Sequence, residues 1–271
     1  MTAELLPLIA ALAASATAAG LLAGLLGVGG GIVLVPVLYW TLSGTGFAPG
    51  ITMHMAVATS LATIMFTSVS SARAHDRRSA VDRGLLRLWG AGLVAGAFAG
   101  GLVARAIDAD ALKTVFGAVA ALVAVNLATP RTLVIAPALP AARAPNWAMA
   151  AVTGLFSALM GIGGGALSVP LLAAFSVEIR RAVGTAAAFG FLIAVPATLG
   201  FVMSGWGVPG RPPLSLGYVN VIAAAVILPF STAAAPFGAR LAHRVNPVWI
   251  RRVFAAFLIV TAIRMLMSVW S

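Results

Sequence analysis

Two related segments, each with a glycine cluster inside a long apolar run, place the strongest constraint on the fold of this chain. They are residues 27–38 (GVGGGIVLVPVL) and 161–172 (GIGGGALSVPLL), which are identical at seven of twelve positions. In a membrane, a helix can be broken in this way only where the freed backbone is buried in protein or lines a wet cavity. The pair therefore predicts a buried site to which both halves of the chain contribute.

Composition indicates an integral membrane protein. Hydrophobic residues make up 61% of the chain and charged residues 8%, and the mean hydropathy is +1.06. The long runs of Ala, Leu and Val are typical of lipid-spanning helices and not of the alternating strands of an outer-membrane barrel. We therefore expect an all-α membrane protein whose main partner is the lipid bilayer.

The apolar runs predict ten transmembrane or partly spanning helices in two sets of five. We expect the first set at 5–26, 29–43, 52–72, 84–105 and 111–128, and the second at 147–160, 164–176, 182–203, 216–240 and 249–269. A stretch with four prolines separates them and cannot be helical throughout. The predicted organisation is a first repeat at 1–128, a cytoplasmic linker at 129–146 and a second repeat at 147–271.

The two halves also match outside the glycine segments. Val57 and Thr59 correspond to Val183 and Thr185, and residues 100–116 align with residues 238–254. Matching blocks in the same order indicate an internal repeat. Because each repeat has an odd number of helices, the second must enter the membrane from the opposite side. We expect inverted repeats with broken, glycine-rich helical hairpins.

The net charge of +11 could suggest nucleic-acid binding, but the placement of the basic residues favours membrane anchoring instead. On alternating sides of the ten helices, thirteen of the seventeen basic residues fall on one side: Arg73, Arg77, Arg78, Arg83, Arg87, Arg131, Arg143, Arg180, Arg181, Arg240, Arg244, Arg251 and Arg252. By the positive-inside rule that side is cytoplasmic. Both termini are then periplasmic, and no nucleic-acid partner is expected.

Each glycine cluster is expected where a helix restarts inside the membrane. Such a start offers unpaired N–H groups and the positive end of the helix dipole, and glycine lets a ligand approach closely. We predict that a small anion binds there, near the midplane. The candidate substrate-binding residues are Gly27, Gly29, Gly30, Gly31, Gly161, Gly163, Gly164, Gly165, Thr59, Thr185 and Arg264, with Pro36 and Pro170 as structural hinges. The alternative is that the glycines serve only close helix packing.

Other functions find less support. The pattern G-x-G-x-x-A at 161–166 follows an apolar helix where a dinucleotide site needs a strand, so no cofactor is expected. All six acids fall in loops or at helix ends, which leaves His54 as a possible proton site. Scattered histidines and the absence of cysteine predict neither a metal site nor an enzyme. Gly92, Gly96 and Gly100 form a small-residue stripe that is most simply a face for close helix packing, with a homodimer as the further alternative.

The paired glycine segments resemble those of the TauE/SafE sulfite exporter family, also called TSUP. In both segments GxGGG is followed by a proline five residues after the last glycine, and the resemblance covers essentially the whole chain. It implies a transporter of small sulfur-containing anions, such as sulfite, thiosulfate, a sulfonate or sulfoacetate, in the bacterial inner membrane. Since no P-loop is present, we expect a secondary transporter driven by a gradient. A passive anion channel of the same architecture is the alternative.

Overall fold

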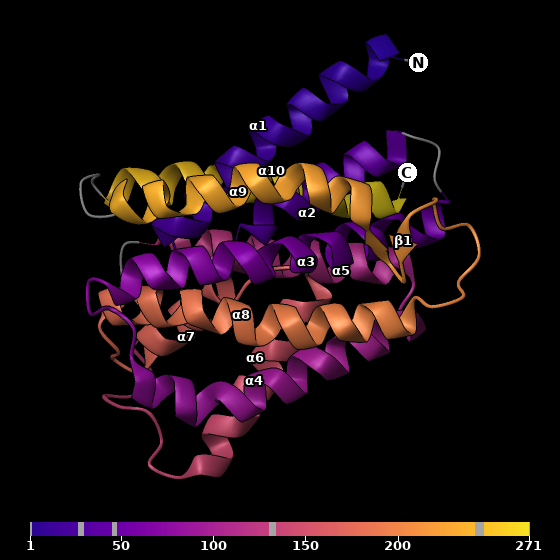
Figure 1. Cartoon of the computed structure of the whole chain (residues 1–271). Helices are drawn as coiled ribbons and strands as arrows, with labels where there is room; N and C mark the ends of the chain where they lie inside the picture. Colours follow the sequence, from indigo (N-terminus) through magenta and orange to yellow (C-terminus); the bar gives the residue numbers. More distant parts are fainter. Residues whose placement is uncertain (1, 27–29, 45–47, 130–133, 242–246, 271) are drawn as a thin grey trace.

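The computed structural model describes residues 2–26, 30–44, 48–129, 134–241 and 247–270. Within these ranges the chain is almost entirely helical (Figure 1). The α-helices are α1 (Thr2–Leu26), α2 (Gly31–Gly44), α3 (Pro49–Asp76), α4 (Arg83–Val103), α5 (Ala109–Ala128), α6 (Arg143–Leu159), α7 (Gly165–Ala174), α8 (Ile179–Ser204), α9 (Val221–Leu241) and α10 (Pro247–Trp270). The ten helices expected from the sequence are all present. A 3-10 turn, η1 (Ala104–Ala106), continues α4.

Several predicted boundaries differ from the structure by a few residues, and two of them have a clear local cause. The linker was expected to reach residue 146, but α6 begins at Arg143, because Pro145 lies in the first helical turn, where proline is tolerated. The helix expected from residue 216 begins at Val221 instead. A short hairpin of β1 (Ser215–Leu216) and β2 (Val219–Asn220) precedes it. The Asn220 side chain then accepts a hydrogen bond from the Ala223 N–H at 3.0 Å, which caps α9.

Six described segments are long and apolar enough to cross a membrane. They are α3, α4 together with η1, α5, α8, α9 and residues 252–270 of α10. By contrast, α2 has 14 residues and α7 has 10. At about 1.5 Å per residue, α7 reaches roughly 15 Å, half of the hydrocarbon thickness. The chain is therefore a multi-pass membrane protein, and two of its helices, α2 and α7, are too short to cross the membrane alone.

The two halves of the chain interleave in one core. Helix α1 packs along α9 and α6 packs along α4, while α3 lies against α8 and α5 against α10. In Figure 1, α9 and α10 lie in the upper part of the bundle, below the projecting α1, while α4 lies in the lower part and α3 and α8 lie between them. Each of these pairings made by a helix of the first half is thus matched by its counterpart in the second half. The buried core draws residues from both halves.

Small residues allow the close approach of these helices. A Cβ atom on Gly96 of α4 would lie 1.9 Å from the carbonyl oxygen of Ala151 in α6, and one on Gly24 of α1 would lie 2.0 Å from the carbonyl oxygen of Ala235 in α9. Gly92 and Gly100 also meet α6. The stripe of Gly92, Gly96 and Gly100 is therefore filled within one chain. The prediction of a close packing face is confirmed, with α6 as the packed helix, and a homodimer stays a prediction.

Long-range hydrogen bonds define the two ends of the helical bundle. At one, the His54 end, His54 bonds to the carbonyl oxygens of Ala104 and Ile107. At the other, the Arg78 end, Arg78 donates to the carbonyl oxygen of Ala239 at 3.1 Å and Arg180 donates to that of Arg78 at 3.4 Å. The basic residues at the end of α3 and the starts of α4 and α8 all lie at the Arg78 end.

Candidate functional site

The second glycine segment forms a buried turn between α6 and α7. Helix α6 ends with hydrogen bonds from the Gly161 N–H to the Ala158 carbonyl and from the Ile162 N–H to the Ser157 carbonyl, both at 3.0 Å. Gly161 has φ +66°, a conformation that side chains rarely adopt. The glycine at this position therefore lets the chain reverse direction inside the protein.

The first glycine segment lies against this turn. A Cβ atom on Gly31, at the start of α2, would lie 2.1 Å from the Gly161 carbonyl oxygen and 2.9 Å from Cα of Ile162. Ser60 of α3 donates to the same Gly161 oxygen at 2.7 Å. Gly30 precedes α2 with φ +76°. The structure thus brings Gly31 to the second segment, whereas Gly30 packs against Ala19 of α1. Gly27 and Gly29 lie outside the described residues.

Helix α8 forms the other wall of the turn. A Cβ atom on Gly164 would lie 2.7 Å from Cβ of Phe189 and 2.9 Å from the Ala186 carbonyl oxygen. Gly164 has φ −57°, unlike its counterpart Gly30. Both glycines are packed against backbone or Cβ atoms, so alanine at either position would disturb the packing as well as any ligand. Gly163 and Gly165 are buried in the same turn.

Unpaired polar groups lie on both sides of the glycine turn in the chain. The first backbone hydrogen bond of α7 joins the Ser168 N–H to the Gly164 carbonyl oxygen at 2.9 Å. The N–H groups of residues 165–167 lie before this bond and have no carbonyl acceptor within the helix. Ser157 and Ser168 are fully buried, and neither hydroxyl has a hydrogen-bond partner. Buried hydroxyls are normally paired, so these two, each within about one helical turn of a turn glycine, are available to an ordered water or a ligand. An anion could accept from the N–H groups and both hydroxyls.

Pro36 lies inside α2 and Pro170 inside α7, in matching positions. Because proline has no N–H, it cannot donate to the carbonyl oxygen four residues earlier. Each short helix is therefore weakened directly after its glycine start, which agrees with a hinge in either half. Hinge motion itself stays a prediction.

Thr59 and Thr185 occupy equivalent places and make equivalent bonds. The Thr59 hydroxyl oxygen accepts from the Asn220 N–H at 2.9 Å, just before α9, and that of Thr185 accepts from the Asp82 N–H at 2.9 Å, just before α4. Each threonine therefore anchors the start of a helix in the other half. Substrate binding by either threonine stays a prediction.

His54 is not the solvated residue that its position near a helix start suggests. It is buried, with Nε2 at 3.0 and 2.9 Å from the carbonyl oxygens of Ala104 and Ile107, and its ring stacks on Tyr218 at 4.9 Å between centroids. Nδ1 has no partner. His54 thus joins α3 to the chain segments at its end of the bundle, and proton transfer by it stays a prediction.

Arg264 lies on α10 and is exposed. Its guanidinium carbon lies 5.9 Å from the centre of the Trp40 ring, in cation–π geometry. The structure therefore places it beside α2 at the surface and does not join it to the buried turn. A role in attracting substrate stays a prediction.

Sequence reasoning missed the serines of the site. Ser60 bonds to the turn, and Ser157 and Ser168 flank it with unpaired hydroxyls, yet none of the three was among the residues selected from the sequence. A usable signal was present, because Ser157 and Ser168 are polar residues four and three positions outside the limits of the turn, Gly161 and Gly165, within runs that are otherwise apolar. Asn220 could likewise have been recognised as a helix cap before an apolar run.

Comparison with known proteins places the chain in a family of membrane proteins. The model of the family "Sulfite exporter TauE/SafE" matches residues 12–265. A probable membrane transporter protein of Haemophilus influenzae is 32% identical over 254 residues, which cover 92% of this chain and 95% of that protein. YunE, a probable membrane transporter protein of Bacillus subtilis, is 28% identical, with 84% and 85% covered.

A probable membrane transporter protein of Methanocaldococcus jannaschii is 25% identical, with 92% of this chain and 91% of that protein covered. No solved structure matches the chain. The family match extends over nearly all of the described helices and both glycine segments, and the named relatives are membrane transporters. This chain therefore belongs to the TauE/SafE sulfite exporter family.

Proposed function

We propose that this chain is a secondary transporter that moves a small sulfur-containing anion, of the sulfite, thiosulfate, sulfonate or sulfoacetate class, across the bacterial inner membrane. The observation that carries the proposal is the meeting of Gly31 with Gly161 beside two buried hydroxyls that lack partners. The substrate class comes from the family, which is that of the TauE/SafE sulfite exporters. The anion is held by N–H groups of helix starts and by serine hydroxyls.

Inverted repeats would place the two glycine segments at the membrane midplane from opposite sides. Two features support this arrangement. First, the helix contacts named above recur between the halves. Second, Thr59 and Thr185 make equivalent bonds, since each accepts from the N–H just before a helix of the other half, that of Asn220 or of Asp82. The basic residues gathered at the Arg78 end support a cytoplasmic location for that end. Rocking of one half against the other would then expose the site to each side in turn.

Reconstitution of the purified chain in proteoliposomes tests the proposal. Uptake of sulfite, thiosulfate, methanesulfonate and sulfoacetate is measured with and without a pH gradient, with chloride as the control anion. We expect saturable uptake of at least one sulfur anion, with chloride neither transported nor competing. If none of the sulfur anions is taken up in a saturable manner, the substrate assignment is wrong.

The same assay separates a transporter from a passive channel. A carrier exposes its site alternately, so labelled anion inside the vesicles should exchange with unlabelled anion outside faster than it leaves alone. A channel should show flux that rises in proportion to concentration and is unaffected by anion on the opposite side. The buried position of the glycine turn favours the carrier.

A further inference from the structure

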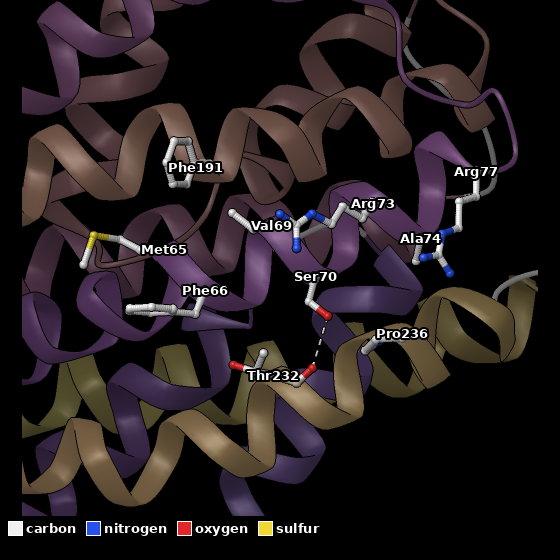
Figure 2. A pocket seen from close by; sticks show the side chains of 10 residues that line it. All are labelled: Met65, Phe66, Val69, Ser70, Arg73, Ala74, Arg77, Phe191, Thr232 and Pro236. Carbon is white, nitrogen blue, oxygen red and sulfur yellow. Dashed lines mark hydrogen bonds between the residues drawn. The ribbon is translucent and has the colours of Figure 1, made fainter.

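A groove between α3, α8 and α9 contains none of the residues of the glycine turn. It has a volume of about 550 Å³ and opens to the surface of the helical bundle. Figure 2 shows its apolar part, formed by Met65, Phe66, Val69 and Phe191, and the side chains of Arg73 and Arg77 farther along α3. The groove therefore has an apolar end and a cationic end.

The apolar end faces outward from the protein. Phe66 is 53% exposed and Phe191 is 42% exposed. Both lie on helices that are long and apolar enough to span the membrane, where exposed apolar rings are expected to face lipid. A ligand of this end of the groove is therefore expected to come from the bilayer.

The dimensions of the groove match one leaflet. From Phe66 to Arg77 there are eleven residues of helix, about 16 Å, close to the roughly 15 Å of half a hydrocarbon core. Phe66 lies near the middle of the 28-residue α3, and Arg77 directly follows its last residue. Between them, Ser70 of α3 donates to the Thr232 carbonyl oxygen of α9 at 3.2 Å (Figure 2). Polarity thus rises along the groove as it does along a phospholipid.

The two arginines of the groove are unneutralised. No acidic residue lines the groove, and neither Arg73 nor Arg77 forms an ion pair with any residue that the structure describes. Nearby arginines do have partners, for example Arg83 with Asp76 and Arg181 with Asp82. Guanidinium groups bind phosphate well through paired hydrogen bonds.

The second half of the chain has no arginine at the positions equivalent to Arg73 and Arg77. If Thr59 is aligned with Thr185, the positions of Arg73 and Arg77 correspond to Leu199 and Met203 on α8. The equivalent face of the other half therefore lacks both cations. The arginines are a property of this groove and not of the fold.

We propose that this groove binds a single anionic phospholipid, with its phosphate on Arg73 and Arg77 and one acyl chain along Met65, Phe66 and Phe191. The headgroup lies at the Arg78 end of the bundle. Anionic lipids are attracted to basic residues at a membrane surface, and the apolar groove adds a fixed site for the chain. The lipid is structural and is not the transported anion.

Native mass spectrometry of the full chain, with added dioleoylphosphatidylglycerol or dioleoylphosphatidylcholine, tests the proposal. We expect the wild type to retain phosphatidylglycerol preferentially. The double variant Arg73→Gln, Arg77→Gln should bind it on the order of tenfold more weakly. Photoreactive phosphatidylglycerol with a mid-chain diazirine should crosslink to peptides that contain residues 65–70 or Phe191.

The matched control is Arg87→Gln, Arg143→Gln, which removes the same charge from exposed positions outside the groove. It should retain phosphatidylglycerol as the wild type does. If both double variants lose phosphatidylglycerol binding equally, the binding depends only on the overall surface charge, and the proposal is overturned. Displacement of the lipid by millimolar methanesulfonate would also overturn it, because the groove would then take a soluble anion. Both double variants must be monodisperse in detergent.

Discussion

At the scale of single residues, Ser168 distinguishes a ligand site from a packing site. A buried hydroxyl without a partner destabilises a protein by about 1 to 3 kcal/mol. Ser168→Ala should therefore leave the melting temperature of the ligand-free protein unchanged or raise it. If an anion normally accepts from this hydroxyl, the same change should weaken substrate binding by roughly tenfold, which calorimetry on the purified protein would measure.

Ser60→Ala is the matched control for Ser168→Ala. The Ser60 hydroxyl is already bonded to the Gly161 carbonyl oxygen, so its removal leaves that oxygen unpaired. The control should lower the melting temperature, in contrast to Ser168→Ala. If Ser168→Ala is neutral for stability and also binds substrate normally, the hydroxyl does not contact the anion.

Asp82 provides a pH-dependent contribution to stability. Partial burial raises the pKa of its carboxyl, but the N–H groups of Leu85 and Gly84 and the guanidinium of Arg181 outweigh this and hold the pKa below its usual range. The contribution is therefore complete above the unfolded pKa of about 3.9 and is lost as the pH falls through the lower folded value.

Asp82→Asn isolates that charge. Asparagine keeps a capping oxygen for α4 but loses the ion pair with Arg181. We expect the variant to melt below the wild type at pH 7, and the difference to shrink as the pH is lowered below about 4. Thermal unfolding between pH 7 and pH 3 measures this. A difference that is independent of pH would show that the charge of Asp82 does not stabilise the fold.

At the scale of helices, the two threonines test the equivalence of the halves. Thr59→Val removes the acceptor of the Asn220 N–H, just before α9. Thr185→Val removes the acceptor of the Asp82 N–H, just before α4. The Thr59 bond is buried and the Thr185 bond only partly buried, so water can replace the second more readily. We expect losses in the free energy of unfolding on the order of 1 to 3 kcal/mol for Thr59→Val and a smaller loss for Thr185→Val.

Thr67→Val serves as the control for this pair. The Thr67 hydroxyl donates only to carbonyl oxygens of its own helix, those of Thr63 and Ile64. Its removal leaves no N–H unpaired and should have little effect on stability. If Thr67→Val is as destabilising as Thr59→Val, the loss reflects the valine side chain in α3 and not the link between the halves.

Sequence patterns predicted the existence of all ten helices, because helix formation depends mainly on the local sequence and each apolar run is bounded by glycine, proline or charged residues. They did not predict which helices pair. Gly96 carries a small-residue signal that suits α6 of the same chain as well as a second copy, and only the three-dimensional packing selects α6. His54 was likewise missed as a buried residue, because the hairpin that brings Tyr218 over its ring is distant in sequence.

At the scale of the whole molecule, the interleaving of the halves argues against independent domains. Helix α1 lies on α9 and α6 lies on α4, so each half supplies a wall for the other. A chain cut in the linker would leave the glycine faces of α1 and α4 without their partners. This arrangement also explains why the glycine segments, 134 residues apart (27 to 161), can share one site.

The orientation of the bundle is tested by single cysteines in this chain, which contains none of its own. If the Arg78 end is cytoplasmic, cysteine in place of Ala141 or Glu178 should react only after a reagent crosses the membrane. Cysteine in place of Ala106 or Pro213 should react with an impermeant maleimide in intact cells, because the His54 end would be periplasmic.

All four positions are exposed, so lack of labelling reports the side of the membrane and not burial. The informative comparison is between Ala141, which follows the first five helices, and Pro213, which follows three more, since an inverted second repeat requires them on opposite sides. Labelling of both from the same side would contradict the inverted arrangement. The shared turn of Gly31 and Gly161 would then need a different explanation from two apices that enter from opposite faces.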